Sequence, residues 1–155
     1  MAHTKPRCEK RLEDYCRRFG VPCTLPLFKS VKRYGGRTRT FTKPFFPGYA
    51  FLHCPSDDIL TAQRSGHIAN LLTVSDQATF AAQLEAILDA LNSDREVRLA
   101  PEIQAGQRVR IKSGSLRGME AWVQDRRGRL EVLLRLDFIG QAAAVSIAAD
   151  ELEPV

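Results

Sequence analysis

The side chains best suited to chemistry in this sequence are its four cysteines, Cys8, Cys16, Cys23 and Cys54. Successive cysteines are 8, 7 and 31 residues apart, so the sequence has neither a CxxC pair nor another regular ligand spacing that would predict a zinc site. Because nothing in the sequence marks the chain for export, reduced and buried thiols are a better interpretation than two disulfides. We therefore expect no metal site, no cofactor and no disulfide.

The adjacent residues His53 and Cys54 are the one pair that resembles a catalytic base beside a thiol nucleophile. Neighbours in a strand point to opposite faces, however, so these two side chains cannot form the hydrogen bond that such a dyad needs. The sequence also contains no GxxxxGK[ST], GxGxxG, HExxH or GxSxG motif. We expect a protein that binds rather than catalyses, and thiol chemistry at Cys54 stays a third hypothesis behind two binding functions.

The positive charge of the chain is concentrated at one end. The 155 residues include 23 Lys and Arg against 18 Asp and Glu, a net charge of +5. Residues 1–50 hold 12 cations and 3 anions, residues 51–100 hold 3 and 7, and residues 101–155 hold 8 and 8. A concentrated positive surface is expected of a nucleic-acid-binding protein, and the alternative is a solvated basic surface with no ligand.

Length and hydropathy exclude two classes of protein. The length suits one ordinary domain or two small ones with a real core. No apolar run reaches the roughly 20 residues of a membrane span, and residues 1–10 lack the apolar core of a signal peptide. We expect a cytoplasmic protein with no membrane partner.

The first part of the chain alternates between helical and extended patterns. Helical spacing of apolar residues predicts a helix over residues 5–19, begun by Thr4 and ended by Gly20, and Gly35-Gly36 predicts the turn of a hairpin. These patterns predict an α+β domain with helices packed on a small antiparallel sheet. The expected strands are 21–28, 28–34, 37–46, 49–54 and 67–74, and the other expected helices are 56–65 and 75–92.

The second part of the chain consists of short strands. Residues 93–104 are polar and aperiodic, which is typical of a linker. Residues 105–155 alternate short apolar segments with glycine turns, which favours a small β-barrel. The expected domains are therefore residues 1–92 and 105–155, joined by a linker at 93–104.

Several features in this order resemble NusG-type transcription factors. They are the run from His3 to Arg7 before a helix, the basic hairpin, the turn Phe46-Pro47-Gly48-Tyr49, and the segment from Gly106 to Gly118. The resemblance covers almost the whole chain. It implies a ferredoxin-like N-terminal (NGN) domain, a KOW-type β-barrel, and a monomeric, non-enzymatic elongation or antitermination factor.

The resemblance also implies a protein partner for the first domain. NusG-type factors bind the clamp helices of the RNA polymerase largest subunit, beside the upstream DNA fork, and the matching residues here are Phe46, Pro47, Tyr49 and Phe51. Alternation places Tyr49 and Phe51 on the same face of a strand, where they could receive an amphipathic helix. The alternative is that both are core residues.

Specialised relatives of the RfaH kind also contact the displaced non-template DNA strand through basic residues. By position these match Lys5, Arg11 and Arg64, and Arg7 is equally basic. Contact of this type tolerates any base sequence and weakens with salt.

The resemblance of the second domain implies a further partner, ribosomal protein S10 or the termination factor Rho. The matching contact residue is Met119, in a loop with Leu116 and Gly118. General NusG proteins usually have phenylalanine at this position. The methionine and the alanine-rich tail favour a specialised, RfaH-like paralogue.

Two departures from the family pattern remain. Family members have an apolar strand before the His-Thr pair, whereas only Met1 and Ala2 precede His3. Either the native start lies upstream, the chain has been shortened, or another segment fills the gap. In addition, residues 130–138 and 141–152 are rich in leucine and alanine, which favour helix, so a switch to a helical hairpin like that of RfaH is a hypothesis.

A second function class stays open. A ribosome-associated or RNA-binding protein could hold structured RNA with its KOW barrel and its basic hairpin. This alternative predicts RNA affinity that survives changes at Tyr49 and Phe51 and falls when the hairpin cations are removed.

Overall fold

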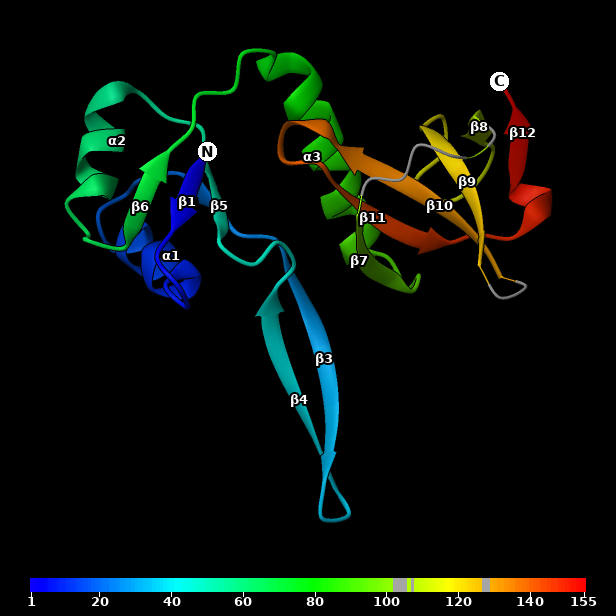
Figure 1. Ribbon diagram of the computed structural model, residues 1–155, viewed down its shortest axis with the longest axis horizontal. Helices are drawn as coiled ribbons and strands as arrows, with labels where there is room; N and C mark the ends of the chain where they lie inside the picture. The colour runs from blue at the N-terminus through cyan, green and yellow to red at the C-terminus, as the bar shows by residue number, and fades with distance from the viewer. Residues whose placement is uncertain (102–105, 107, 127–128) are drawn as a thin grey trace. The chain divides into compact units, whose positions relative to one another are not determined.

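The computed structural model describes residues 1–101, 106, 108–126 and 129–155 and divides into two compact units (Figure 1). The first unit is Met1–Val74 and the second is Ser75–Val155. Each unit contains helix and antiparallel sheet, so the predicted α+β class is confirmed.

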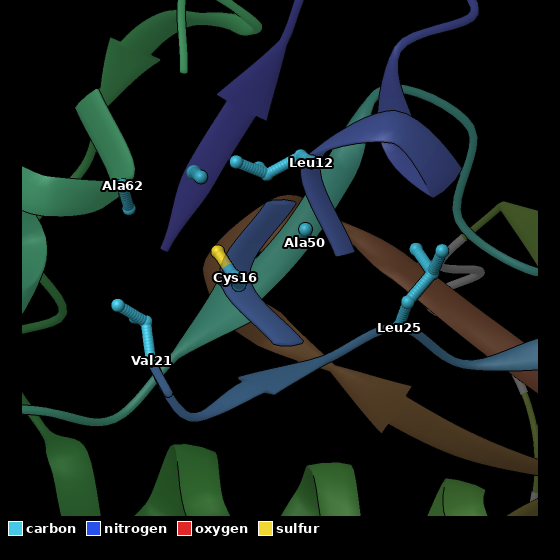
Figure 2. Packing of buried hydrophobic residues seen from close by; sticks show 7 residues of the cluster. Leu12, Cys16, Val21, Leu25, Ala50 and Ala62 are labelled. Carbon is cyan, nitrogen blue, oxygen red and sulfur yellow. The ribbon is translucent and has the colours of Figure 1, made fainter. Parts of the chain in front are cut away.

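The first unit is built on a four-stranded antiparallel sheet in the order β2-β5-β1-β6. Its strands are β1 (Ala2–Thr4), β2 (Cys23–Thr24), β5 (Tyr49–Leu52) and β6 (Ile68–Leu71), and its helices are α1 (Glu9–Arg18) and α2 (Ser56–Gln63). Ala2 on β1 and Ala50 on β5 are paired and fully buried. They belong to one core cluster with Leu12 and Cys16 of α1 and Ala62 of α2 (Figure 2).

The central strand β1 includes the His3-Thr4 pair itself. Ala2 pairs with Ala50 on one side and Leu71 on the other. The amino group of Met1 donates to the Leu72 carbonyl at 2.9 Å. Strand β1 therefore joins β5 and β6 into one sheet.

Helix α1 begins later than the sequence predicted, because Thr4 is the last residue of β1 rather than a helix cap. The chain then turns at residues 5–8, where the Cys8 N–H donates to the Lys5 carbonyl at 3.0 Å. Arg7 has a φ of 59°, which a helix cannot contain. The helix starts at Glu9, directly after this turn.

The predicted basic hairpin is present as β3 (Leu27–Tyr34) and β4 (Arg37–Pro44), which extend away from the four-stranded sheet of their unit (Figure 1). Its turn residues Gly35 and Gly36 have φ values of 52° and 79°. Two successive positive φ values are those of a type I′ turn, which suits the twist of a two-residue hairpin.

The second unit combines helix α3 (Gln77–Asn92) with a six-stranded antiparallel sheet in the order β12-β8-β9-β10-β11-β7. The strands are β7 (Val97–Pro101), β8 (Arg108–Ile111), β9 (Glu120–Arg126), β10 (Arg129–Leu136), β11 (Gln141–Ser146) and β12 (Leu152–Pro154), with 3-10 turns at Asp137–Ile139 and Ala149–Glu151. Among the described residues β12 and β7 do not pair, so the sheet has an open order and a closed barrel stays a prediction.

Helix α3 and the predicted linker both take part in the second unit. Gln83 of α3 donates to the Asp137 carboxylate at 2.8 Å and accepts from the Asp137 N–H at 3.1 Å. The rings of Phe80 and Phe138 meet edge to face at 6.1 Å. Residues 97–101, within the expected linker, form β7 and pair with β11; residues 102–105 lie outside the described part. The contacts thus divide the chain at 74/75, whereas the sequence prediction placed the boundary at 93–104.

The leucine- and alanine-rich segments form strands in this structure. Val132–Leu134 and Ala142–Val145 are buried without alternation, which shows that both faces of β10 and β11 are covered. A strand covered on both faces needs small or apolar side chains throughout. Packing therefore overrides the helix preference of these residues. None of the described helices is long and apolar enough to cross a bilayer.

Candidate functional site

The turn from Phe46 to Tyr49 has a fixed geometry. The Tyr49 N–H donates to the Phe46 carbonyl at 3.1 Å, and Gly48 has a φ of 87°. Proline at the second position of a four-residue turn, followed by glycine with a positive φ at the third, is typical of a type II turn. Pro47 and Gly48 therefore set the direction in which the chain enters β5.

Two neighbouring elements hold this turn in place. The Gly48 N–H donates to Oε1 of Glu9 at 2.7 Å, and the Thr4 N–H donates to the Gly48 carbonyl at 2.8 Å. Glu9 is only 8% exposed, which is unusual for a carboxylate and is explained by this hydrogen bond. Sequence reasoning missed Glu9. Its position in the sequence could have indicated burial, because Glu9 precedes Leu12 by three residues and Cys16 by seven and so lies on the apolar stripe of the helix.

Phenylalanine rings pack beneath the turn. Phe46 meets Phe45 at 4.9 Å and Phe51 at 6.0 Å, both edge to face. Phe45 in turn meets Phe28 of β3 at 5.9 Å. Phe46 is 1% exposed and Phe51 is 5% exposed. These two predicted polymerase-binding residues therefore support the surface from below.

The other two predicted contact residues lie at the surface. Pro47 is exposed and Tyr49 is half-buried, with its ring 5.3 Å from that of the exposed His3. Ala50, between Tyr49 and Phe51, belongs to the core cluster, and Ala50 and Phe51 are both buried. The structure thus brings Phe46 and Phe51 into ring contact and leaves Pro47 and Tyr49 nearer the surface.

The four predicted DNA-binding cations Lys5, Arg7, Arg11 and Arg64 are all exposed. The Lys5 N–H donates to the carbonyl of His67 at 2.9 Å, which brings the turn before α1 beside the segment that follows Arg64. Within the part of the chain that the structure describes, these cations form no ion pair, whereas Arg17 pairs with Glu13 and Asp14 on the same helix. Their charges are available to a ligand.

The predicted partner loop of the second unit is closed by backbone hydrogen bonds. The Gly118 N–H donates to the Ile111 carbonyl at 2.8 Å, and the Ile111 N–H donates to the Met119 carbonyl at 2.9 Å. Leu116 is fully buried, Gly118 is exposed with a φ of 85°, and Met119 is half-buried. Leu116 anchors the loop, and Gly118 and Met119 lie nearer the surface.

Three of the four cysteine thiols, those of Cys16, Cys23 and Cys54, are poorly suited to nucleophilic chemistry. Burial raises the pKa of Cys23 to about 12, and it also raises the pKa values of Cys16 and Cys54. The reactive thiolate is therefore disfavoured at neutral pH. All four cysteines are free thiols, and the described residues contain no His, Cys, Asp and Glu cluster arranged to hold a metal ion.

Comparison with known protein families finds a match for the first part of the chain. The family described as transcription termination factor NusG matches residues 1–87, which is more than half of the chain. The matched range contains β1, the turn at Phe46–Tyr49 and the basic hairpin. Comparison with curated proteins gave no match.

Proposed function

The chain belongs to the NusG family of transcription factors, and from this premise we propose that its first unit binds the clamp helices of the RNA polymerase largest subunit. Bound there, beside the upstream DNA fork, the protein promotes processive transcription. Its site of action is the cytoplasm, and it acts as a monomer without catalysis.

The observation that carries this proposal is the supported turn at Phe46–Tyr49. Glu9 and Thr4 fix its backbone, and the buried ring of Phe46 packs edge to face against that of Phe51. A surface held this rigidly loses little conformational entropy on binding. Pro47 and Tyr49 present an apolar patch of the kind that receives an amphipathic helix.

The first unit also has a proposed contact with nucleic acid, formed by the cations Lys5, Arg7, Arg11 and Arg64. We assign them to the phosphates of the non-template DNA strand. For a single strand, each neutralised phosphate contributes about −0.7 to the slope of the logarithm of the binding constant against the logarithm of the salt concentration.

The second unit is proposed to be a KOW-type domain that recruits another protein, ribosomal protein S10 or Rho. Its contact is the loop that carries Gly118 and Met119, with Leu116 as the buried anchor. Methionine suits an adaptable apolar contact because its side chain is flexible and polarizable.

The test is a pair of matched tyrosine substitutions in the full chain. We expect Tyr49→Ala to weaken association with purified, nucleic-acid-free RNA polymerase at least about tenfold, because Tyr49 is the larger side chain of the patch and tyrosine is enriched among residues that dominate binding energy. Tyr34→Ala removes an equally large side chain from the exposed hairpin and should leave that association unchanged. Phe51 is left intact because truncating a buried ring would destabilise the unit. Failure of the wild type to bind polymerase would refute the proposal, as would equal effects of the two substitutions.

The basic hairpin favours a second candidate function, that of a ribosome-associated or RNA-binding protein. It would bind structured RNA independently of Tyr49. Tight binding to a folded RNA with no association with polymerase would select this alternative.

A further inference from the structure

The hairpin β3–β4 has two chemically different faces. Residues directly opposite in an antiparallel pair share a face, and the register pairs Tyr34 with Arg37, Lys32 with Arg39, and Val31 with Thr40. One face, here called the aromatic–basic face, consists of Phe28, Ser30, Lys32, Tyr34, Arg37, Arg39, Phe41 and Lys43. The other, here called the threonine face, consists of Lys29, Val31, Arg33, Thr38, Thr40 and Thr42.

The aromatic–basic face brings like charges together with no compensation. Lys32 and Arg39 lie directly opposite each other, an arrangement that destabilises a hairpin. Residues 27–44 contain six cations and no acid. Among the described residues, no carboxylate forms an ion pair with any of the four cations on this face. The charge on this face is therefore complementary to a polyanion.

The same face exposes aromatic rings. Tyr34 is 55% exposed and Phe41 is 39% exposed, and their rings meet edge to face at 6.5 Å. At the base of the hairpin Phe28 is anchored on Phe45, and Lys10 of α1 donates to the Thr42 carbonyl. The hairpin is thus attached at its base, while its outer part offers two rings between the cations.

We propose that the aromatic–basic face of the hairpin binds an unpaired nucleic-acid strand. Lys32, Arg37 and Arg39 neutralise successive phosphates, and bases stack on Tyr34 and Phe41. Cations along the strand path combined with exposed aromatic platforms are the combination that binds single strands without sequence preference.

An unpaired strand fits this face better than a duplex. Bases inside a duplex already stack on each other, so exposed rings gain nothing there, whereas every unpaired base offers a free face. Neither contact requires the 2′-hydroxyl group. We therefore expect DNA and RNA strands of matched sequence to bind within about threefold of each other.

The proposal does not depend on polymerase binding. It adds a second nucleic-acid contact to the one already assigned to the cations near α1.

The probe is a fluorescein-labelled oligothymidine, and its binding to the full chain is measured by fluorescence anisotropy over a series of salt concentrations. The paired variants are Lys32→Gln/Arg39→Gln on the aromatic–basic face and Lys29→Gln/Arg33→Gln on the threonine face. Both remove two charges from the same hairpin, so they differ only in the face that is changed.

We expect the Lys32→Gln/Arg39→Gln variant to bind about tenfold more weakly and its salt slope to fall by about 1.4, since two phosphate contacts are lost. The Lys29→Gln/Arg33→Gln variant should lose no more than about threefold. Tyr34→Leu/Phe41→Leu keeps apolar contact within the hairpin and should weaken binding at least about fivefold through lost stacking. Circular dichroism confirms that each variant is folded.

Four results would overturn the proposal: no binding by the wild type, equal losses from both charge variants, tighter binding of the matching duplex, or a preference above tenfold for one sugar. Polymerase association of the same variants is measured in parallel. Tyr49→Ala should reduce that association and leave oligothymidine binding intact, so failure of this proposal is distinguishable from failure of the proposed function.

Discussion

At the scale of single residues, two turns carry the proposed binding surfaces of the first unit. Phe46–Tyr49 places glycine at the position with positive φ, whereas the turn at residues 5–8 places Arg7 there with a φ of 59°. A residue with a Cβ costs about 1–2 kcal/mol in this conformation. Arg7 therefore combines an exposed charge with local strain, which fits a position kept for binding rather than for stability.

Replacing Arg7 should separate these two effects. Arg7→Gly relieves the strain, partly offset by the greater entropy of the unfolded chain, so we expect a net gain of roughly 0.5–1 kcal/mol in the free energy of unfolding. Arg7→Ala removes the same charge but keeps the strain. Both variants should weaken oligonucleotide binding equally, and only the glycine variant should be more stable in urea. If the two variants unfold at the same urea concentration, the turn is not strained.

At the scale of elements, hydrophobic periodicity predicted much of the fold. Helices near α1, α2 and α3 and the β3–β4 hairpin follow from residue spacing and from the Gly35-Gly36 turn. Strand β1 was missed because three residues are too few to show alternation. Strand β7 was missed because it contains Arg98 and directly follows the charged residues Asp94, Arg95 and Glu96. The hydrogen bonds between Gln83 of α3 and Asp137, in the 3-10 turn after β10, join residues 54 apart, and no local pattern encodes them. In the candidate site, the half-buried position of Tyr49 and the burial of Phe51 likewise depend on tertiary packing.

One ion pair attaches the segment after α3 to the sheet of the second unit. Arg95 donates to both carboxylate oxygens of Glu151, at 2.7 and 3.1 Å, and Ser113 donates to the same carboxylate at 2.8 Å. Chiefly the Arg95 hydrogen bond, and then that of Ser113, lowers the pKa of Glu151 to about 2. A carboxyl group with a lowered pKa in the folded state stabilises that state above its unfolded pKa of about 4.3. The stabilisation is lost as the pH falls toward 2.

We therefore expect Glu151→Gln to lower the melting temperature of the second unit at pH 7 and to have progressively less effect between about pH 5 and pH 2. Trp122, the only tryptophan of the chain, lies on β9 and reports unfolding of this unit by fluorescence. Glu153→Gln, a carboxylate change at a more exposed position nearby, is the matched control and should have a small effect throughout. A Glu151→Gln effect of equal size at pH 7 and near pH 2 would contradict the ion-pair assignment.

At the scale of the whole molecule, charge divides along the two units. Residues 1–74 carry 13 cations and 5 anions, a net +8, whereas residues 75–155 carry 10 and 13, a net −3. The overall charge of +5 conceals this difference. The division fits a first unit that works beside nucleic acid and a second unit that binds protein. The family match likewise covers all of the first unit and ends within α3 of the second.

The most direct test of the central claim is site-specific photocrosslinking in a transcription elongation complex, with a photoreactive phenylalanine at position 49 and, as control, at position 34. We predict that position 49 crosslinks to the clamp helices of the polymerase largest subunit and that position 34 does not. Crosslinks from position 49 to another subunit, or equal clamp crosslinking from both positions, would contradict binding through the Phe46–Tyr49 turn.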